Sequence, residues 1–348
     1  MIAAVYQVCQ GTIGTPPGGL SGTMPRMPNI LLVRMSSMGD LIHTLPVVSD
    51  LRAHFPDARI DWVAEEQYVE LPALHPGVSH ILPIAIRRWR KRLWSRVVWQ
   101  EIRTFLDQLQ QVRYDAIIDP QGLLKSAWVC GRARGPSCAF DRSNIRDRFA
   151  LPFYDRTFAI PTGDHVITKN RKLAGLALGY TPEAAIHYGI RNVDHALPWL
   201  PQGRFAALLT NTARAAKEWP EAHWITLGQQ LHTAGIRSLF TWGSEPERVR
   251  SERLAAAIPD AQVAPRLTLL DATAMLSHAT LAVGVDTGFT HIANAVETPT
   301  IALFCDSDPN HAGVMGDQYV ANLGGVQVQP TVAQVWQHAS AALARITS

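Results

Sequence analysis

The chain has 348 residues, 47% of them hydrophobic, and a formal net charge of +3. This length exceeds a typical domain of roughly 100–200 residues, so we expect two domains, each with its own core. No run of about 18 or more residues is wholly apolar, so no membrane-spanning helix is expected. The four cysteines form no CxxC pair and no metal-ligand spacing, which favours free thiols in a reducing cytosol.

The charge is unevenly distributed along the chain. Residues 1–190 contain 22 Lys and Arg against 16 Asp and Glu, whereas residues 191–348 contain 10 against 13. This asymmetry favours an anionic partner for the first half, although a solubilising surface explains the same composition.

The first 26 residues form no recognisable element. Residues 1–23 carry no charge and lack the basic start and the long apolar core of a secretory signal. We expect a disordered leader over 1–26, with Met24 or Met27 as an alternative start.

Strands and helices alternate over a first domain, 27–190. Short apolar runs predict strands, and apolar residues at helical spacing predict the helices between them. The expected strands are Asn29–Val33, Ala58–Ala64, His80–Ile84 and Tyr114–Asp119, and the expected helices are Leu41–Phe55, Ser95–Gln111 and Gly122–Arg132. This alternation predicts βαβ units and a parallel sheet.

The pattern restarts in a second domain, 203–330, after a weakly patterned stretch. The expected strands are Phe205–Thr210, Ser238–Trp242, Leu281–Val285 and Thr300–Phe304, and the expected helices are Glu221–Thr233, Pro246–Ala257, Leu269–His278 and Thr290–Val296. A last helix is expected over Val332–Ile346, within 331–348, and packing back on the first domain is one arrangement for it. Its apolar face contains Val332, Val335, Trp336, Ala339 and Leu343. The fold class is therefore α/β, with two Rossmann-like doubly wound domains that face a central cleft. Ligands of such sheets bind beyond the carboxyl ends of the strands.

The loop from Met35 to Asp40 lies at such a strand end in the first domain. Its small residues let a ligand approach the backbone, and the following helix start favours negative charge. Asp40 has two interpretations, a simple helix cap or a ligand-side carboxylate. The chain contains neither a GxGxxG fingerprint after this strand nor a P-loop.

A basic segment follows the third expected strand. Five of the six residues from Arg87 to Arg92 are cationic. A solvated surface and a nucleic-acid contact are both available interpretations, but no nucleic-acid-binding signature accompanies the segment. Because Arg matches phosphate and carboxylate geometry, a compact polyanionic acceptor is the sharper interpretation. The segment from Asp119 to Ser126 ends the fourth strand at the same sheet edge.

Two strand ends of the second domain carry comparable groups. Lys217 stands just ahead of a helix start and suits a phosphate, although an exposed lysine is equally compatible. Asp286, Thr287 and Gly288 open another helix and form an anion site with a carboxylate beside it. His291 is more typical of a structural histidine. The DxD at Asp306–Asp308 favours a turn over a metal site.

Taken together and in order from Asn29 to Leu343, these segments resemble the lipopolysaccharide heptosyltransferases of glycosyltransferase family 9. The matching segments are Met35–Asp40, Ala85–Lys91, Asp119–Ser126, Lys217–Pro220 and Val285–Gly288. The basic segment favours the enzymes that add the first heptose over those that add the second. The resemblance implies the GT-B fold and inverting transfer without a metal ion or another cofactor.

The resemblance also implies the substrates. The donor would be ADP-L-glycero-β-D-manno-heptose, and the acceptor would be Kdo2-lipid A at the cytoplasmic face of the inner membrane, to which the enzyme would bind peripherally. Nucleic acid would not be a partner. The implied catalytic base is Asp40. The implied donor-binding residues are Thr212, Lys217, Glu247, Asp286, Thr287 and Gly288, and the implied acceptor-binding residues are Arg87, Arg88, Arg90, Lys91, Gln121, Lys125 and Arg146.

The chain departs from the family pattern in a few places. Thr212-Ala213 stands where the family often has two threonines, so one phosphate-side hydroxyl is missing. Ala215 and Ala216 replace acidic residues that often precede the lysine. Three alternatives remain: a family 9 enzyme with another acceptor, a sugar-nucleotide epimerase of similar architecture, and a non-catalytic protein that binds a sugar nucleotide or lipid A.

Overall fold

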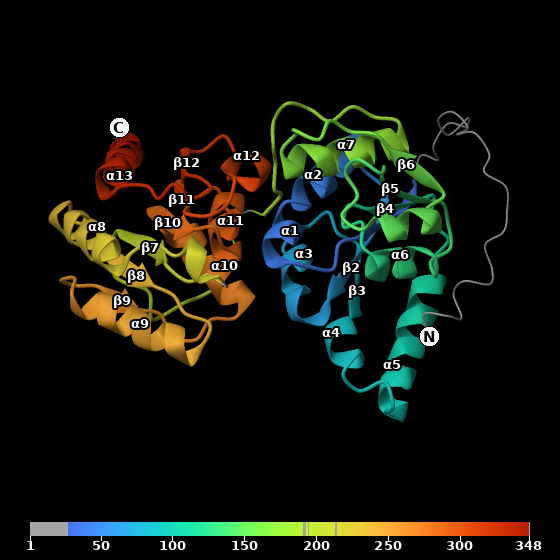
Figure 1. The fold of residues 1–348 in the computed structure, drawn as a ribbon, viewed down its shortest axis with the longest axis horizontal. Helices are drawn as coiled ribbons and strands as arrows, with labels where there is room; N and C mark the ends of the chain where they lie inside the picture. The colour runs from blue at the N-terminus through green and yellow to red at the C-terminus, as the bar shows by residue number, and fades with distance from the viewer. Residues whose placement is uncertain (1–26, 191–192, 194, 213, 348) are drawn as a thin grey trace.

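The computed structural model describes residues 27–190, 193, 195–212 and 214–347, and the leader expected over 1–26 lies outside them. The chain forms two α/β domains that lie side by side, the first coloured blue to green and the second yellow to red in Figure 1. Within the described residues, no helix has the length and apolar character needed to cross a membrane.

The first domain is built on a six-stranded parallel sheet with the order β3-β2-β1-β4-β5-β6. Its strands are β1 (Asn29–Val33), β2 (Arg59–Glu65), β3 (His80–Ile84), β4 (Ala116–Asp119), β5 (Ser137–Phe140) and β6 (Arg156–Phe158). Its helices are α1 (Met38–Ile42), α2 (Leu45–His54), α3 (Glu70–Ala73), α4 (Ile86–Trp89), α5 (Arg96–Gln110), α6 (Leu124–Cys130) and α7 (Val166–Leu178). The central strands are buried on both faces, which explains why near-continuous apolar runs predicted them.

The second domain repeats this plan with a sheet of order β12-β11-β10-β7-β8-β9, again parallel. Its strands are β7 (Phe205–Leu209), β8 (Arg237–Phe240), β9 (Gln262–Val263), β10 (Leu281–Val285), β11 (Thr300–Phe304) and β12 (Val320–Gly324). Its helices are α8 (Glu221–Thr233), α9 (Glu245–Ala256), α10 (Leu269–His278), α11 (Gly288–Ala295), α12 (Pro309–Ala312) and α13 (Val332–Thr347). The predicted pair of doubly wound domains is confirmed.

Both sheets have the same topology. Counted from the start of each domain, the strand order is 3-2-1-4-5-6 in both. The chain direction around the sheet reverses between β1 and β4 in the first domain and between β7 and β10 in the second. Ligands of doubly wound sheets bind outside the carboxyl ends of the strands at this reversal. The loops after these four strands are therefore where the functional groups are expected.

Several elements differ from the sequence expectation. The helix expected over Leu41–Phe55 is two helices, because Pro46 lacks a backbone N–H and suits the first turn of α2, which begins at Leu45. Strands β5, β6, β9 and β12 and helix α7 were not predicted. Helix α7 buries the polar residues Asn170 and Arg171, and Arg171 forms a two-pronged ion pair with Asp50 at 2.7 Å. These buried polar residues weaken the apolar periodicity that would have identified the helix.

The last helix also differs from the arrangement considered for it. Helix α13 packs against α8 and the strands β10, β11 and β12 of the second domain, not back on the first domain. Val335, Ala339 and Leu343 join the core that contains Trp219 and Trp224. The apolar stripe of the helix was therefore identified correctly, but the surface that it covers was not.

The two domains meet where α1 contacts α11. A side chain on Gly39 would place its Cβ 3.1 Å from the ring of His291, and one on Gly288 would place it 2.3 Å from the sulfur of Met38. A Cβ on Gly288 would overlap the Met38 side chain and one on Gly39 would be tight against the His291 ring, so the starts of these two helices approach closely. The contact brings the loop after β1 close to the loop after β10.

Candidate active site

Asp40 lies in the first turn of α1, just beyond the carboxyl end of β1. One carboxylate oxygen accepts a hydrogen bond from the Arg34 guanidinium at 2.5 Å, and the other accepts from the Ser37 backbone N–H at 2.9 Å and hydroxyl at 3.0 Å. Asp40 therefore caps its own helix, as one sequence interpretation had it. It is also one half of an ion pair, a feature that a simple cap does not need.

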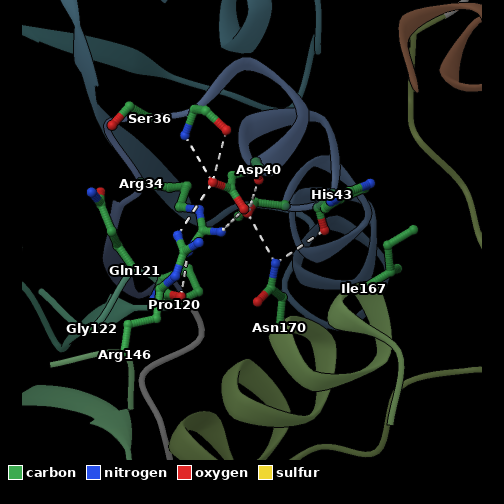
Figure 2. Close-up of polar contacts among 12 residues, drawn as sticks. Arg34, Ser36, Asp40, His43, Pro120, Gln121, Gly122, Arg146, Ile167 and Asn170 are labelled. Atoms are coloured by element: carbon green, nitrogen blue, oxygen red, sulfur yellow. Dashed lines mark hydrogen bonds and ion pairs between the residues drawn. The ribbon is translucent and has the colours of Figure 1, made fainter. Parts of the chain in front are cut away.

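The cation that holds Asp40 is deeply buried. Arg34 directly follows β1, and its second terminal nitrogen donates to the backbone carbonyl of Pro120 at 2.5 Å. Figure 2 shows Arg34 and Arg146 directed toward the Asp40 carboxylate. Burial alone would raise the pKa of Asp40, but the charges of Arg34 and Arg146 and the Ser37 N–H outweigh it and hold the pKa far below its usual range. The carboxylate is therefore ionised at neutral pH.

Three residues expected on the acceptor side surround this loop. Gln121 accepts a hydrogen bond from the Met35 backbone N–H at 2.9 Å, Lys125 donates to the Ser36 hydroxyl at 3.0 Å, and a terminal nitrogen of Arg146 lies 3.5 Å from Asp40. Burial lowers the pKa of Lys125, an effect that the Glu65 carboxylate opposes. The structure thus brings the loops after β1 and β4 together at the reversal point of the first sheet.

The basic segment forms α4 and the start of the next loop, at the carboxyl end of β3. Trp89 is buried and donates its ring N–H to Glu101 at 2.6 Å. Arg88 forms ion pairs with Glu66 at 3.0 Å and Glu101 at 2.9 Å. Arg90 and Lys91 are exposed. The segment therefore lies at the same sheet edge as Asp40, but two carboxylates already occupy the Arg88 guanidinium.

The corresponding point of the second domain carries a second ion pair. Lys217, after β7, donates to the Asp286 carboxylate, after β10. The Ser307 hydroxyl donates to the same oxygen at 2.8 Å. Lys217 lies in a short 3-10 turn whose position is fixed by Trp219, which is fully buried and donates to the carbonyl of Pro330 at 2.8 Å.

The environment of Asp286 also keeps it ionised. Burial alone would raise its pKa, but the nearby His291 side chain and the hydrogen bond from Lys217 outweigh burial and hold the pKa far below its usual range. Thr287 is the N-cap of α11 and makes no capping bond through its side chain, and Gly288 begins the helix. The hydroxyl and the first N–H groups are therefore available for an anion.

Within the described residues, the side chains of Thr212 and Glu247, two of the expected donor residues, form no hydrogen bond with Lys217 or with the Asp286 carboxylate. The Thr212 hydroxyl is 3.5 Å from the backbone carbonyl of Asp286, and Ala213 lies outside the described residues. Glu247 accepts hydrogen bonds from Gly243 at 2.7 Å and Ser244 at 2.9 Å, and so caps α9. In the structure Glu247 acts as a helix cap after β8, and its assignment to the ribose stays a prediction.

Two histidines meet at the contact between the domains, and one of them lies beside the second ion pair. His43 of α1 lies 3.2 Å from His291 of α11 between ring nitrogens, and His291 lies 3.6 Å from Asp286. Burial, reinforced by the positive charge that His291 can carry, moves the pKa of His43 well below its usual range. His291 was expected to be structural, and its position at the domain contact gives it this additional connection.

Sequence reasoning missed Arg34, Ser37, His43 and Ser307. A charged residue directly after a buried strand, at the reversal point of the sheet, is the signal that would have identified Arg34. The DxD lies outside the group around Asp40. The carboxylate of Asp308 accepts from the Asn310 N–H at 2.9 Å and caps α12, which supports the turn interpretation.

Comparison with known proteins identifies the family. Residues 102–339 match the model described as glycosyltransferase family 9 (heptosyltransferase). The chain is 40% identical over 295 residues to the Pseudomonas aeruginosa lipopolysaccharide heptosyltransferase 1, a match that covers 84% of this chain and 82% of that protein.

Solved structures agree with this assignment. The E. coli heptosyltransferase WaaC with ADP is 36% identical, with a TM-score of 0.82 over 90% of this chain and 99% of that one. The same enzyme with ADP-2-deoxy-2-fluoro heptose is 35% identical, with a TM-score of 0.78 and the same coverage. These similarities confirm the GT-B fold that the sequence predicted. This chain belongs to glycosyltransferase family 9, the heptosyltransferases.

Proposed function

We propose that the protein transfers heptose from ADP-L-glycero-β-D-manno-heptose to the Kdo sugar of Kdo2-lipid A, with inversion at the anomeric carbon. The observation that carries the proposal is the pairing of the two sites. An ionised carboxylate stands at the reversal point of one sheet and a lysine–aspartate pair at that of the other, and α1, which carries Asp40, contacts α11, which begins just after Asp286. The names of the relatives support the choice of sugar and of acceptor class.

In the proposed reaction, a Kdo hydroxyl attacks the anomeric carbon while the bond to the ADP oxygen breaks. The hydroxyl proton passes to the Asp40 carboxylate, and ADP leaves with the bonding electron pair. Inversion requires the base and the leaving group on opposite faces of the sugar. A base in the first domain and a phosphate site in the second meet this requirement when a substrate lies between them.

The charge of each remaining side chain suggests which part of the substrates it would bind. Lys217, Thr212, Thr287 and Gly288 would bind the diphosphate, because cations and helix N–H groups stabilise charge that develops on a leaving group. Asp286 would accept hydrogen bonds from heptose hydroxyls, and Glu247 from the ribose. The acceptor side would be Arg87, Arg88, Arg90, Lys91, Gln121, Lys125 and Arg146.

A lipid acceptor implies work at a membrane surface. Because Kdo2-lipid A is anchored by its acyl chains, the enzyme would act as a peripheral protein at the cytoplasmic face of the inner membrane. The positive charge of the first half of the chain favours such a surface.

The direct test is ADP release. We expect rapid release when the protein is mixed with ADP-heptose and Kdo2-lipid A, and none above background when either substrate is omitted. Binding of ADP-heptose without acceptor-dependent release would instead indicate a non-catalytic binding protein. Release with a different heptose acceptor, but not with Kdo2-lipid A, would keep the reaction and change the acceptor.

A further inference from the structure

Exposed apolar side chains gather where α4 leads into α5. Trp94 is 84% exposed, Val97 62%, Trp99 48% and Leu93 38%. We call these four residues the tip patch. Figure 1 shows the loop between α4 and α5 at the lower tip of the first domain, away from the second domain. A group of large apolar side chains on a protruding surface marks a site of contact with an apolar partner.

The tip patch is held in its exposed position by the residues beneath it. The Trp99 ring N–H donates to the carbonyl of Leu93 at 2.7 Å, which fixes the loop against α5. Val98 and Phe105 are buried against the sheet, and Glu101 binds both Trp89 and Arg88. The apolar side chains therefore face outward because the helix is anchored on its other side.

Positive charge surrounds the tip patch. Residues 87–103 contain seven Lys and Arg and one acidic residue, Glu101. In the part of the chain that the structure describes, Arg92 and Arg96 are exposed and form no ion pair. Tryptophan flanked by Arg and Lys suits the boundary between lipid headgroups and acyl chains, since the rings enter the boundary while the cations meet phosphates.

We propose that the tip patch docks on an anionic phospholipid bilayer. Trp94 and Val97 would enter the headgroup boundary, and Arg92 and Arg96 would bind lipid phosphates. The choice of a bilayer rests on the proposed function, whose acceptor is a lipid. A second copy of the chain is a poor occupant, because it would bring two strongly cationic loops together.

Docking by this loop also orients the enzyme. The loop leaves the carboxyl end of β3, and α5 runs back along the sheet from it. Asp40 follows the carboxyl end of β1 at the same sheet edge. A bilayer bound by the tip patch would therefore face the edge that carries the base, where the sugar of a lipid-anchored acceptor has to arrive.

The test is sedimentation of the full chain with vesicles. We expect binding to vesicles of phosphatidylethanolamine and phosphatidylglycerol, little binding to phosphatidylcholine alone, and weakening with salt. The W94S/V97S variant should bind about tenfold or more weakly, because it removes the inserted side chains. The R92Q/R96Q variant should lose about fivefold per charge.

Matched controls change equivalent residues elsewhere. The V326S/V328S variant removes two exposed valines of the second domain. The R132Q/R134Q variant removes two exposed arginines near the amino ends of the strands of the first sheet. Both should bind like the unchanged protein. Equal binding by W94S/V97S and V326S/V328S, absence of anionic vesicle binding by the unchanged protein, or a dimer that W94S/V97S converts to a monomer would each overturn the proposal.

A second measurement separates this proposal from the proposed function. W94S/V97S should transfer heptose to a deacylated, water-soluble Kdo acceptor at the unchanged rate, and more slowly to Kdo2-lipid A in vesicles. Equal transfer to both acceptors would overturn the docking role and leave the activity intact. Vesicle binding through the tip patch without any heptose transfer would instead refute the activity and keep the docking surface.

Discussion

The two halves of the site use the same topology with different cations. In the first domain Asp40 pairs with Arg34, whose side chain is buried and also bound to the carbonyl of Pro120. In the second domain Asp286 pairs with Lys217, which lies in a short turn at the surface of the sheet edge.

This difference predicts different roles for the two ion pairs in the reaction. Arginine stays charged at any physiological pH and its planar group is fixed by two partners, so Asp40 is held in one orientation and one charge state. Lysine is a point charge on a flexible stem, so Lys217 can leave Asp286 and turn to a phosphate. In the proposed reaction the first site would therefore act as a fixed reagent, and the second as a clamp that exchanges Asp286 for a phosphate.

The largest expected effect comes from removing the fixed reagent. Asp40→Asn keeps the shape of the side chain but cannot take a proton, so kcat should fall by about 10²–10⁴-fold. Calorimetry should show ADP-heptose affinity close to that of the unchanged protein. Asp57→Asn, an exposed aspartate of the same domain, is the control and should leave kcat unchanged. Near-normal turnover by Asp40→Asn would remove Asp40 from the mechanism.

Removing Lys217 should mainly weaken the binding of the donor, ADP-heptose. Lys217→Ala should weaken ADP-heptose binding about 10- to 100-fold, in line with the loss of one or two charged hydrogen bonds. Titration calorimetry with ADP-heptose measures this, and Lys169→Ala, which removes a half-buried lysine of α7 far from Asp286 in sequence, serves as the control. An effect on the acceptor KM alone would contradict the assignment of Lys217 to the donor.

Replacing Arg34 should change how kcat/KM depends on pH. Arg34→Gln removes the charge that keeps the pKa of Asp40 low, so this pKa should rise. The acid limb of kcat/KM should then move to higher pH, with a loss of about tenfold at neutral pH from poorer orientation. Arg34→Lys should move the limb partly back. An unmoved acid limb in Arg34→Gln would show that Arg34 has only a structural role.

A smaller effect is expected in the basic segment. Arg90→Ala should raise the acceptor KM about two- to fivefold and leave the donor KM unchanged, as for an exposed charge. Arg88→Ala should do the same and also lower the thermal midpoint, since its ion pairs with Glu66 and Glu101 connect α4 to the neighbouring elements. Steady-state kinetics with each substrate varied in turn distinguish an effect on the acceptor KM from one on the donor KM. A change confined to the donor KM would rule out the acceptor role.

The buried histidines predict how stability depends on pH. Burial lowers the pKa of His75 and of His165 to about 4, and that of His43 also falls well below its usual range. As pH drops below about 6.5, the unfolded chain therefore takes up protons that the folded chain does not, and stability falls. Between pH 6.5 and 5, His75 and His165 should each cost about 1.5 kcal/mol.

Denaturant titrations at several pH values measure this loss. His43→Gln should reduce the slope, because one of the groups is gone. Asp40 and Asp286 affect stability at lower pH. Their lowered pKa values stabilise the folded state above about pH 4, and this contribution is lost as the pH falls below that value. A stability that stays constant from pH 6.5 to 5 would contradict the neutral, buried state of these histidines.

Much of this site could be predicted because it lies in loops after short apolar strands. Asp40, Lys217 and Asp286 each follow such a strand, and parallel topology brings strand ends to one edge. Arg34 could not be recognised in the same way, because a single arginine after a strand usually reaches solvent, and its partner Pro120 is 86 residues away.

The missed elements have a related cause. Strand β5 has four residues and β6 has three, too few for a pattern. In α7 the side chain of Arg171 is buried only because Asp50 lies opposite it, 121 residues earlier in the chain. For α13 the stripe of Val335 and Ala339 was visible, but periodicity does not tell which sheet a stripe covers.

The ion pair between Arg34 and Asp40 has a consequence for the timing of the chemistry. A carboxylate so strongly stabilised as an anion has little affinity for a proton while the acceptor hydroxyl is intact. In the proposed reaction, proton transfer to Asp40 would become favourable only late, as the new glycosidic bond forms and the hydroxyl becomes acidic. The rate then depends on how well the nucleophile is aligned rather than on how easily it is deprotonated. In the proposed reaction, a water molecule that no cationic segment aligns would gain little from such a base, which would protect the donor from hydrolysis between encounters with the acceptor.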